Sequence, residues 1–163
     1  MTTATVERKI KGLDTENRSA FFNTQEKDVY VEGRKVESKK AVVREDTQEV
    51  LSIMSKNYKP VNNKAVLMAF DEIATEAKIE WKLDSCYQIQ NGTKTFMKIV
   101  FPGHSLVVGK LTGGKPDILW LEGYLGNGFD GFNAATLDLS WLRQICTNGM
   151  IGRLGKVLTI TIN

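Results

Sequence analysis

The chain has 163 residues, of which 42% are hydrophobic and 25% charged, a composition typical of a globular domain with its own core. Its formal charge of +3 comes from 22 Lys plus Arg against 19 Asp plus Glu, so the total charge by itself does not indicate a polyanionic partner. Two Cys and one His exclude a disulfide scaffold and a four-ligand zinc site, and no apolar run approaches the roughly 20 residues of a membrane span.

The first 26 residues are polar, mixed in charge and weakly periodic, which predicts a loosely ordered N-terminal arm. The start of the chain lacks the apolar run of a signal peptide. Together with the low cysteine content, this predicts a reducing, cytoplasmic setting and no membrane attachment. Residues 27–163 are expected to form a single α+β domain.

Alternating apolar residues between positions 29 and 54 predict two short antiparallel strand pairs. The segment from 62 to 78 has the spacing of a helix, and either Asn62 or Asn63 is suited to cap its start. The apolar residues at helical spacing are Val66, Phe70, Ile73 and Ala77. We expect this segment to be the main amphipathic helix.

A β-hairpin is predicted from residue 79 to residue 101, because apolar and polar residues alternate on both sides of the turn at Asn91 and Gly92. A two-residue loop would place Lys94, Phe96 and Lys98 beside Tyr87 and Leu83. A three-residue loop, 91–93, places Met97, Ile99 and Phe101 beside Tyr87, Ser85 and Leu83. We prefer the three-residue loop, because it keeps lysines off the apolar face.

Residues 104–117 are expected to form a loop with a short strand, and residues 118–128 a third long strand. The sequence LRQICTNGM, 142–150, predicts one or two helical turns ending at Gly149, and Val157, Thr159 and Thr161 predict a last strand. The expected fold is therefore α+β: an antiparallel sheet with a long central hairpin, one main amphipathic helix before it and a short helix after the third strand.

The polar face of the hairpin is the best candidate for binding nucleic acid, because lysines alternate with an aromatic residue there. Lysines in this arrangement can follow a phosphate backbone while Phe96 stacks on a base, although an ordinary solvated face has the same pattern. Glycines near the end of the chain, with Arg153 and Lys156 among them, suggest a second place for a phosphate. The candidate nucleic-acid-binding residues are Lys82, Lys94, Phe96, Lys98, Tyr124, Arg143, Arg153 and Lys156.

Other chemistries have weaker support in the sequence. A nucleophilic cysteine needs a nearby base, and His104 is the single histidine, so Cys146 is expected to be a small buried hydrophobe. His104 is expected to face solvent or to bond locally. Scattered carboxylates, including Glu122 and Asp130, leave a metal-dependent nuclease as a third hypothesis. No catalytic residue and no cofactor is predicted.

Four short motifs, in order and spacing, resemble the phage- and plasmid-like family of domain of unknown function 932, over about residues 30–162. The matching positions are Arg44, Asp46 and Thr47; Tyr58, Pro60, Val61 and Asn63; Asn127, Asp130 and Gly131; and Arg143, Cys146 and Asn148. One motif departs from the family, since its usual His-Asp-Gly-Ser reads Phe129-Asp130-Gly131-Phe132 here. The resemblance implies a phage or plasmid setting and no particular activity.

The expected order of helix, three long strands and short helix is also similar to the core of single-strand annealing recombinases of the Erf and RecT group, an analogy of fold alone. That similarity implies a basic groove for single-stranded DNA and side-by-side assembly into a homo-oligomer. The leading hypothesis is therefore a non-enzymatic, ATP-independent and sequence-tolerant protein that binds and anneals single-stranded DNA. The alternative is a protein-interaction module, either a virion component or a host-takeover factor.

Overall fold

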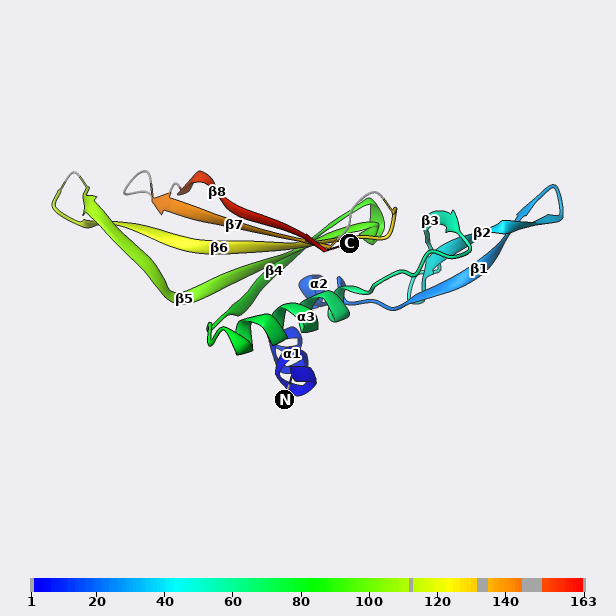
Figure 1. Cartoon of the computed structure of the whole chain (residues 1–163), viewed down its shortest axis with the longest axis horizontal. Helices are drawn as coiled ribbons and strands as arrows, with labels where there is room; N and C mark the ends of the chain where they lie inside the picture. Colours follow the sequence, from blue (N-terminus) through cyan, green and yellow to red (C-terminus); the bar gives the residue numbers. More distant parts are fainter. Residues whose placement is uncertain (1, 112, 132–134, 145–150, 163) are drawn as a thin grey trace.

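The computed structural model describes the backbone of residues 2–111, 113–131, 135–144 and 151–162. Side chains are described in the same ranges except at residues 2, 144, 151–157 and 160–162. Antiparallel sheets dominate this mixed structure, with helices before and between them (Figure 1). None of the described helices is long and apolar enough to cross a membrane.

A three-stranded sheet extends from one end of the molecule (Figure 1). Its strands, in the order β1-β2-β3, are β1 (Thr24–Val31), β2 (Arg34–Arg44) and β3 (Val50–Ser55). The sequence predicted two separate strand pairs in this region. A single sheet forms instead because β2, with 11 residues, is long enough to pair with both neighbours.

A five-stranded antiparallel sheet contains the predicted hairpin and the strands that follow it. In the order β4-β5-β6-β7-β8, its strands are β4 (Lys82–Ile89), β5 (Lys94–Lys110), β6 (Pro116–Gly128), β7 (Ala135–Gln144) and β8 (Ile151–Ile162). The hairpin, the third long strand and the last strand are thus confirmed. The expected loop after residue 104 is instead a continuation of β5 to Lys110.

The main helix is α3 (Asn63–Glu76), as predicted, and Asn62 caps it by accepting a hydrogen bond from the backbone N–H of Ala65 at 2.8 Å. Its buried stripe is Val66, Leu67, Phe70 and Ala74. Ile73, expected in that stripe, is 61% exposed. The helix is rotated relative to our expectation because Leu67, fully buried, faces the sheet instead.

Residues 1–26 contain more structure than the expected arm, namely α1 (Thr2–Lys11), α2 (Thr15–Arg18) and the start of β1. The physical reason is burial, since Val6 of α1 lies in the main core beside α3. The Nζ atom of Lys9 also donates to the backbone carbonyl of Trp81 at 2.9 Å and lies 3.3 Å from the centre of its ring. These contacts attach α1 to both α3 and the start of β4.

The main core lies between α1, α3 and one face of the five-stranded sheet. Alternate residues of β5, namely Met97, Ile99 and Phe101, face the helices and are buried. The intervening residues 94, 96, 98 and 100 therefore lie on the opposite face, which we call the outer face. Residues directly paired across an antiparallel sheet share a face, so Glu122 and Tyr124 of β6 lie on it too.

The hairpin register differs from the preferred prediction. Tyr87 pairs with Phe96 and Cys86 with Met97, which are the partners given by the rejected two-residue loop. A β-bulge between Leu83 and Ser85 changes which residues of β4 face the helices, so Leu83 and Cys86 both pack against the core. Tyr87 consequently points to the outer face, and no lysine has to enter the core.

The short helix expected at 142–150 does not begin at Arg143, because β7 continues through Gln144 and Arg143 pairs with Leu119 and Gly152. Residues 145–150, including Cys146 and Gly149, lie outside the described residues. Pairing with β6 and β8 holds residues 142 and 143 in a strand despite the helical sequence pattern.

Candidate functional site

The outer face of the five-stranded sheet gathers five of the eight predicted site residues. Along the face, Lys82 pairs with Val100, Lys98 pairs with Tyr124, and Phe96 pairs with Gly126. Because these strands are hydrogen-bonded neighbours, their side chains form adjacent rows. The five residues are Lys82, Lys94, Phe96, Lys98 and Tyr124.

Two lysines of β5, Lys94 and Lys98, are paired with carboxylates. The Nζ atom of Lys98 lies 2.9 Å from Glu122 and 3.5 Å from Asp84, and that of Lys94 lies 3.4 Å from Asp130. Burial works against the charge of Lys98, but the hydrogen bond to Glu122 and the nearby carboxylates outweigh it, so the pKa of Lys98 is raised. Lys98 therefore remains cationic, yet much of the field of both lysines is neutralised locally.

Arg143 is not brought together with the lysines. It pairs with Leu119 of β6, which lies on the same face of the strand as Leu121 because the two are separated by one residue. Leu121 packs against the core, so Arg143 also lies on the face of the sheet that faces the helices. Its Nε atom donates to the buried carboxylate of Asp117 at 3.0 Å, and this bond raises the pKa of the guanidinium. The backbones of Arg153 and Lys156 pair with Leu142 and Ser140, while their side chains lie outside the described residues.

Two aromatic side chains stand opposite each other on the outer face. Tyr87 is 66% exposed, and its partner Phe96 is 37% exposed. On the other side of Phe96 is Gly126, where a Cβ atom would come within 3.4 Å of the ring. The glycine therefore allows the ring to lie close to β6 with part of its surface free.

Tyr87 is the functional candidate that the sequence reasoning missed, because the preferred register assigned it to the core. Ile89, next in alternation, is also half exposed. The end of the hairpin has three large apolar residues, each next to a polar residue in the sequence, namely Tyr87, Ile89 and Phe96. This pattern is the signal that favours the register in which they face away from the core. Together Tyr87, Phe96 and Ile89 form a patch that we call the aromatic platform.

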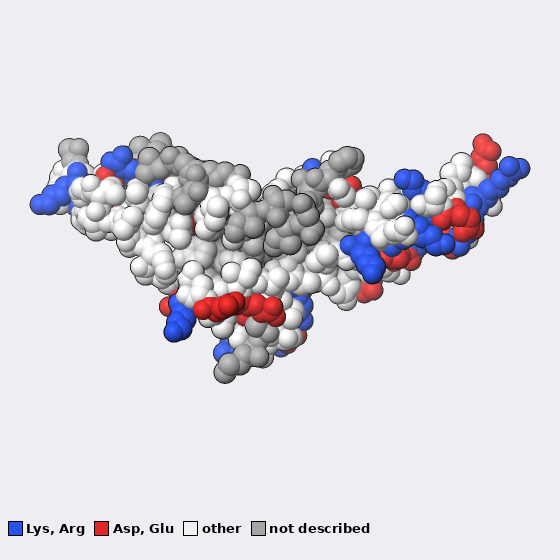
Figure 2. All heavy atoms as spheres, viewed as in Figure 1, with Lys and Arg blue, Asp and Glu red and all other residues white. Residues whose placement is uncertain are grey.

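Charge is distributed in separate groups on the face of the molecule shown in Figure 2. Basic and acidic side chains are interspersed over β1 to β3, and acidic side chains gather over the helices. The β1–β3 surface contains pairs such as Lys40 with Glu26 at 2.6 Å and Lys35 with Asp28 at 2.9 Å. Local pairing of this kind weakens a long-range field toward polyanions.

The junction between the two sheets is built on a buried arginine. Arg44, at the end of β2, forms two hydrogen bonds with the carboxylate of Asp46 at 2.9 and 2.7 Å. It also donates to the backbone carbonyl of Asn91 at 2.8 Å and lies 3.8 Å from the ring centre of Phe22. A Cβ atom on Gly92 would lie 2.6 Å from that ring, so only glycine fits this approach.

A second polar cluster continues the junction across α3, β5 and β6. The Nδ2 atom of Asn63 donates to the carbonyl of Ala20 at 2.6 Å and to the hydroxyl of Thr95 at 3.0 Å. The Nδ2 atom of Asn127 donates to the side-chain oxygen of Asn63 and to the carbonyl of Val61, both at 2.8 Å. These groups are buried and saturated with partners, so they stabilise the junction.

Comparison with protein families gives one match. The model of the family described as Domain of unknown function (DUF932) covers residues 50–162. The chain belongs to this family. No curated protein and no solved structure shows a significant match, so the similarity to single-strand annealing recombinases has no support among them.

In this DUF932 chain, the motif residues serve mainly to join the two sheets. Asn63 and Asn127 hydrogen-bond to each other, and Tyr58 donates to the carbonyl of Gly128 at 3.4 Å. Arg44 and Asp46 lie in the same junction, before the first residue that the family model matches. These motif positions therefore contribute to how the two sheets are joined, whereas Arg143 pairs with Asp117 within the five-stranded sheet and Asp130 pairs with Lys94.

Thiol and metal chemistry find no site in the described part of this DUF932 chain. Burial, with the nearby charge of Asp14, raises the pKa of the Cys86 thiol to about 12, so it stays protonated. His104 is exposed, and its Nδ1 atom lies 3.2 Å from the carbonyl of Pro102, the local contact that was expected. No three His, Cys, Asp or Glu side chains in the described ranges lie close enough together to hold a metal ion.

Proposed function

We propose that this DUF932 chain binds single-stranded DNA on the outer face of its five-stranded sheet and promotes annealing of complementary strands. The aromatic platform is the observation that carries the proposal. Exposed aromatic rings on a sheet are suited to stacking on unpaired bases, and stacking tolerates any base because every base has a π-face. Lys94 and Lys98 lie on each side of Phe96 along the same face of β5.

The proposed binding relies on stacking more than on charge, because carboxylates neutralise Lys94 and Lys98. Lys82 is exposed and has no ion pair among the described side chains, so it is the cation on this face that is open to a phosphate. Annealing requires only that bases stay accessible while repulsion between strands is reduced. We therefore propose a non-enzymatic role that needs no ATP, in recombination of phage or plasmid DNA.

The test measures binding of a labelled oligothymidine of about 16 nucleotides, the upper range of sites on small sheet proteins, by fluorescence anisotropy. Phe96→Ala and Tyr87→Ala should each weaken binding by about fivefold or more, since each removes one stacked base. Tyr30→Ala is the matched control, because Tyr30 is an exposed aromatic residue of β1. Absence of binding at low salt, or equal affinity for all four proteins, would refute the proposal.

Oligomerisation is proposed from a different observation, the exposed apolar residues of the β5–β6 hairpin. Leu106, Val107 and Val108 are between 52% and 69% exposed. Apolar clusters of this kind on adjacent positions usually mark an association surface. The same surface favours the second candidate function, a protein-interaction module.

Light scattering separates these roles. Val107→Lys should reduce self-association and slow annealing if the hairpin joins copies of the chain. A protein that stays monomeric at all concentrations and binds no DNA would instead support the interaction module. The described residues offer no observation that favours a metal-dependent nuclease.

A further inference from the structure

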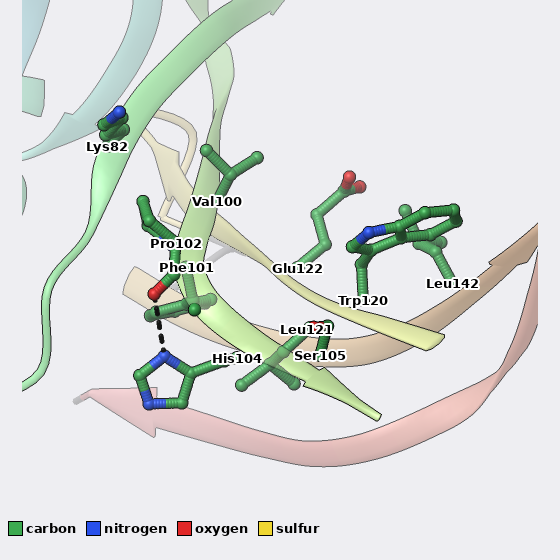
Figure 3. Close-up of a pocket in the computed structure, with 11 residues that line it drawn as sticks. Lys82, Val100, Phe101, Pro102, His104, Ser105, Trp120, Leu121, Glu122 and Leu142 are labelled. Atoms are coloured by element: carbon green, nitrogen blue, oxygen red, sulfur yellow. Dashed lines mark hydrogen bonds between the residues drawn. The ribbon is translucent and has the colours of Figure 1, made fainter. Parts of the chain in front are cut away.

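A pocket of about 510 Å³ opens on the outer face (Figure 3), at the place where β5 bends (Figure 1). Residues 101–104 of β5 stand opposite Leu121 alone, because the pairing with β6 is interrupted between Val100 and Ser105. Pro102 and Gly103 are the cause, since proline donates no backbone hydrogen bond and Gly103 has a φ of 78°. The interruption separates the strands enough to form the hollow.

A carboxylate lies on the wall of this pocket. Glu122 is 4% exposed, and Figure 3 shows its carboxylate beside the indole of Trp120. It forms an ion pair with Lys98 at 2.9 Å. It is thus an acceptor fixed in position for a ligand with N–H donors.

The rest of the lining suits a flat, neutral ring. Trp120 offers an aromatic wall and is partly exposed, while Val100, Leu121 and Leu142 supply apolar surface. Among the lining residues, Lys82 at the rim offsets the charge of Glu122, and outside the pocket Lys98 pairs with both Glu122 and Asp84. Because these charges balance, the pocket favours a neutral ligand over a cation such as an arginine side chain.

Among the nucleobases, guanine fits this arrangement. Its N1–H and N2–H groups are adjacent donors on one edge and match the two oxygens of a carboxylate. Its O6 and N7 atoms are acceptors, and lysine is a common partner for them. Adenine, cytosine and thymine do not present two adjacent ring-edge N–H donors.

We infer that the pocket binds one unstacked guanine base, with Glu122 accepting its N–H groups and Trp120 stacking on its ring. Lys82 at the rim contacts the O6 edge or the adjoining phosphate. This inference rests on the proposed function, because the guanine belongs to a bound single strand. The pocket and Phe96 lie on the same face of β5, four residues apart, or about 14 Å at 3.4 Å per residue.

The experiment compares oligothymidine with versions that carry one central deoxyguanosine or one deoxyinosine, which lacks the N2 amino group. The deoxyguanosine version should bind about fivefold more tightly than the other two, the effect of one or two well-formed hydrogen bonds. Glu122→Gln and Trp120→Leu should abolish this preference. Trp120→Leu should leave binding of plain oligothymidine almost unchanged, whereas Glu122→Gln also removes a carboxylate that neutralises Lys98.

Asp84→Asn is the matched control, because it also removes a carboxylate near Lys98 but does not line the pocket. It should keep the preference for guanine. If oligothymidine binds without any preference for guanine, the inference is overturned and the proposed function stands.

Guanosine monophosphate alone tests the pocket when no oligonucleotide binds. Binding that requires Glu122 would then support the pocket while refuting the proposed function. If guanosine and adenosine monophosphates bind equally, or neither binds, the assignment of guanine is overturned.

Discussion

Lys98 shows how far a basic residue depends on its surroundings. In the sequence it is one of several lysines on a polar face, whereas in the structure two carboxylates lie within 3.5 Å of its Nζ atom. One of them, Glu122, comes from the neighbouring strand and is buried. The side chain therefore fixes the position of an acceptor in a pocket, which a count of lysines does not suggest.

Cys86 should be unreactive in the folded protein, because burial raises its pKa to about 12. In a Cys146→Ser background, a thiolate-directed reagent at pH 8 should label Cys86 at least about a hundredfold more slowly than free cysteine. The labelling rate is measured by absorbance, and denaturant should restore it. Fast labelling without denaturant would contradict the buried position of the thiol.

Asp46 should make stability depend on acid pH. The hydrogen bond from Arg44 lowers its pKa from 3.8, so its contribution is complete above that value and is lost as the pH falls through the lowered pKa. Asp46→Asn should lower the urea midpoint at pH 7 and show a smaller further decrease below about pH 4 than the wild type.

The matched control for Asp46 is Glu37→Gln, which removes an exposed carboxylate 3.8 Å from Lys56. It should leave both the midpoint and its acid response nearly unchanged. An Asp46 variant that responds to acid as strongly as the wild type would refute the role of this pair.

At the scale of elements, α3 is attached to the sheet at its first turn. Asn62 caps the helix. The next residue, Asn63, bonds to Ala20 in the segment after α2, to Thr95 of β5 and to Asn127 of β6. Two adjacent asparagines thus have different tasks, one local and one tertiary.

This division predicts different costs for the two substitutions. Asn62→Ala should reduce the free energy of unfolding by about 1 kcal/mol, the usual value of a lost cap. Asn63→Ala should cost about 2 kcal/mol or more, because it removes the buried hydrogen bonds to Ala20, Thr95 and Asn127. Urea unfolding followed by circular dichroism measures both, and equal effects would contradict the assignment.

The hairpin shows what alternation along one strand predicts and where it fails. The strand 82–89, the first part of β5 up to residue 101 and the turn between them follow from local residue types, whereas the continuation of β5 to Lys110 does not. The faces do not, because the bulge beside Asp84 shifts the alternation of β4 by one residue. As a result, Cys86 packs against the core, and Tyr87, which was expected there, lies on the outer face.

At the scale of the whole molecule, salt dependence should report how many cations are free. Six candidate cations would give a slope of log K against log salt of about −4 for single strands. Lys94, Lys98 and Arg143 are paired with carboxylates, and without a contribution from these three the slope would be about −2. A titration of oligothymidine at several salt concentrations measures it.

The outcome of that titration separates two forms of binding. A slope near −4 would show that the carboxylates give up their lysines when DNA binds. A slope near zero would show that phosphate contacts make no contribution, contrary to the proposed role of Lys82.

The sequence by itself determined the main helix with its cap, the hairpin, the third strand and the last strand, because each depends on residues close together in the chain. Only the tertiary structure decided which side chains share a face, which lysines are neutralised and where the pocket opens. Those properties depend on partners far apart in sequence, such as Asn63 and Asn127, which are 64 residues apart. Local periodicity contains no information about such pairs, and packing of the folded chain brings them together.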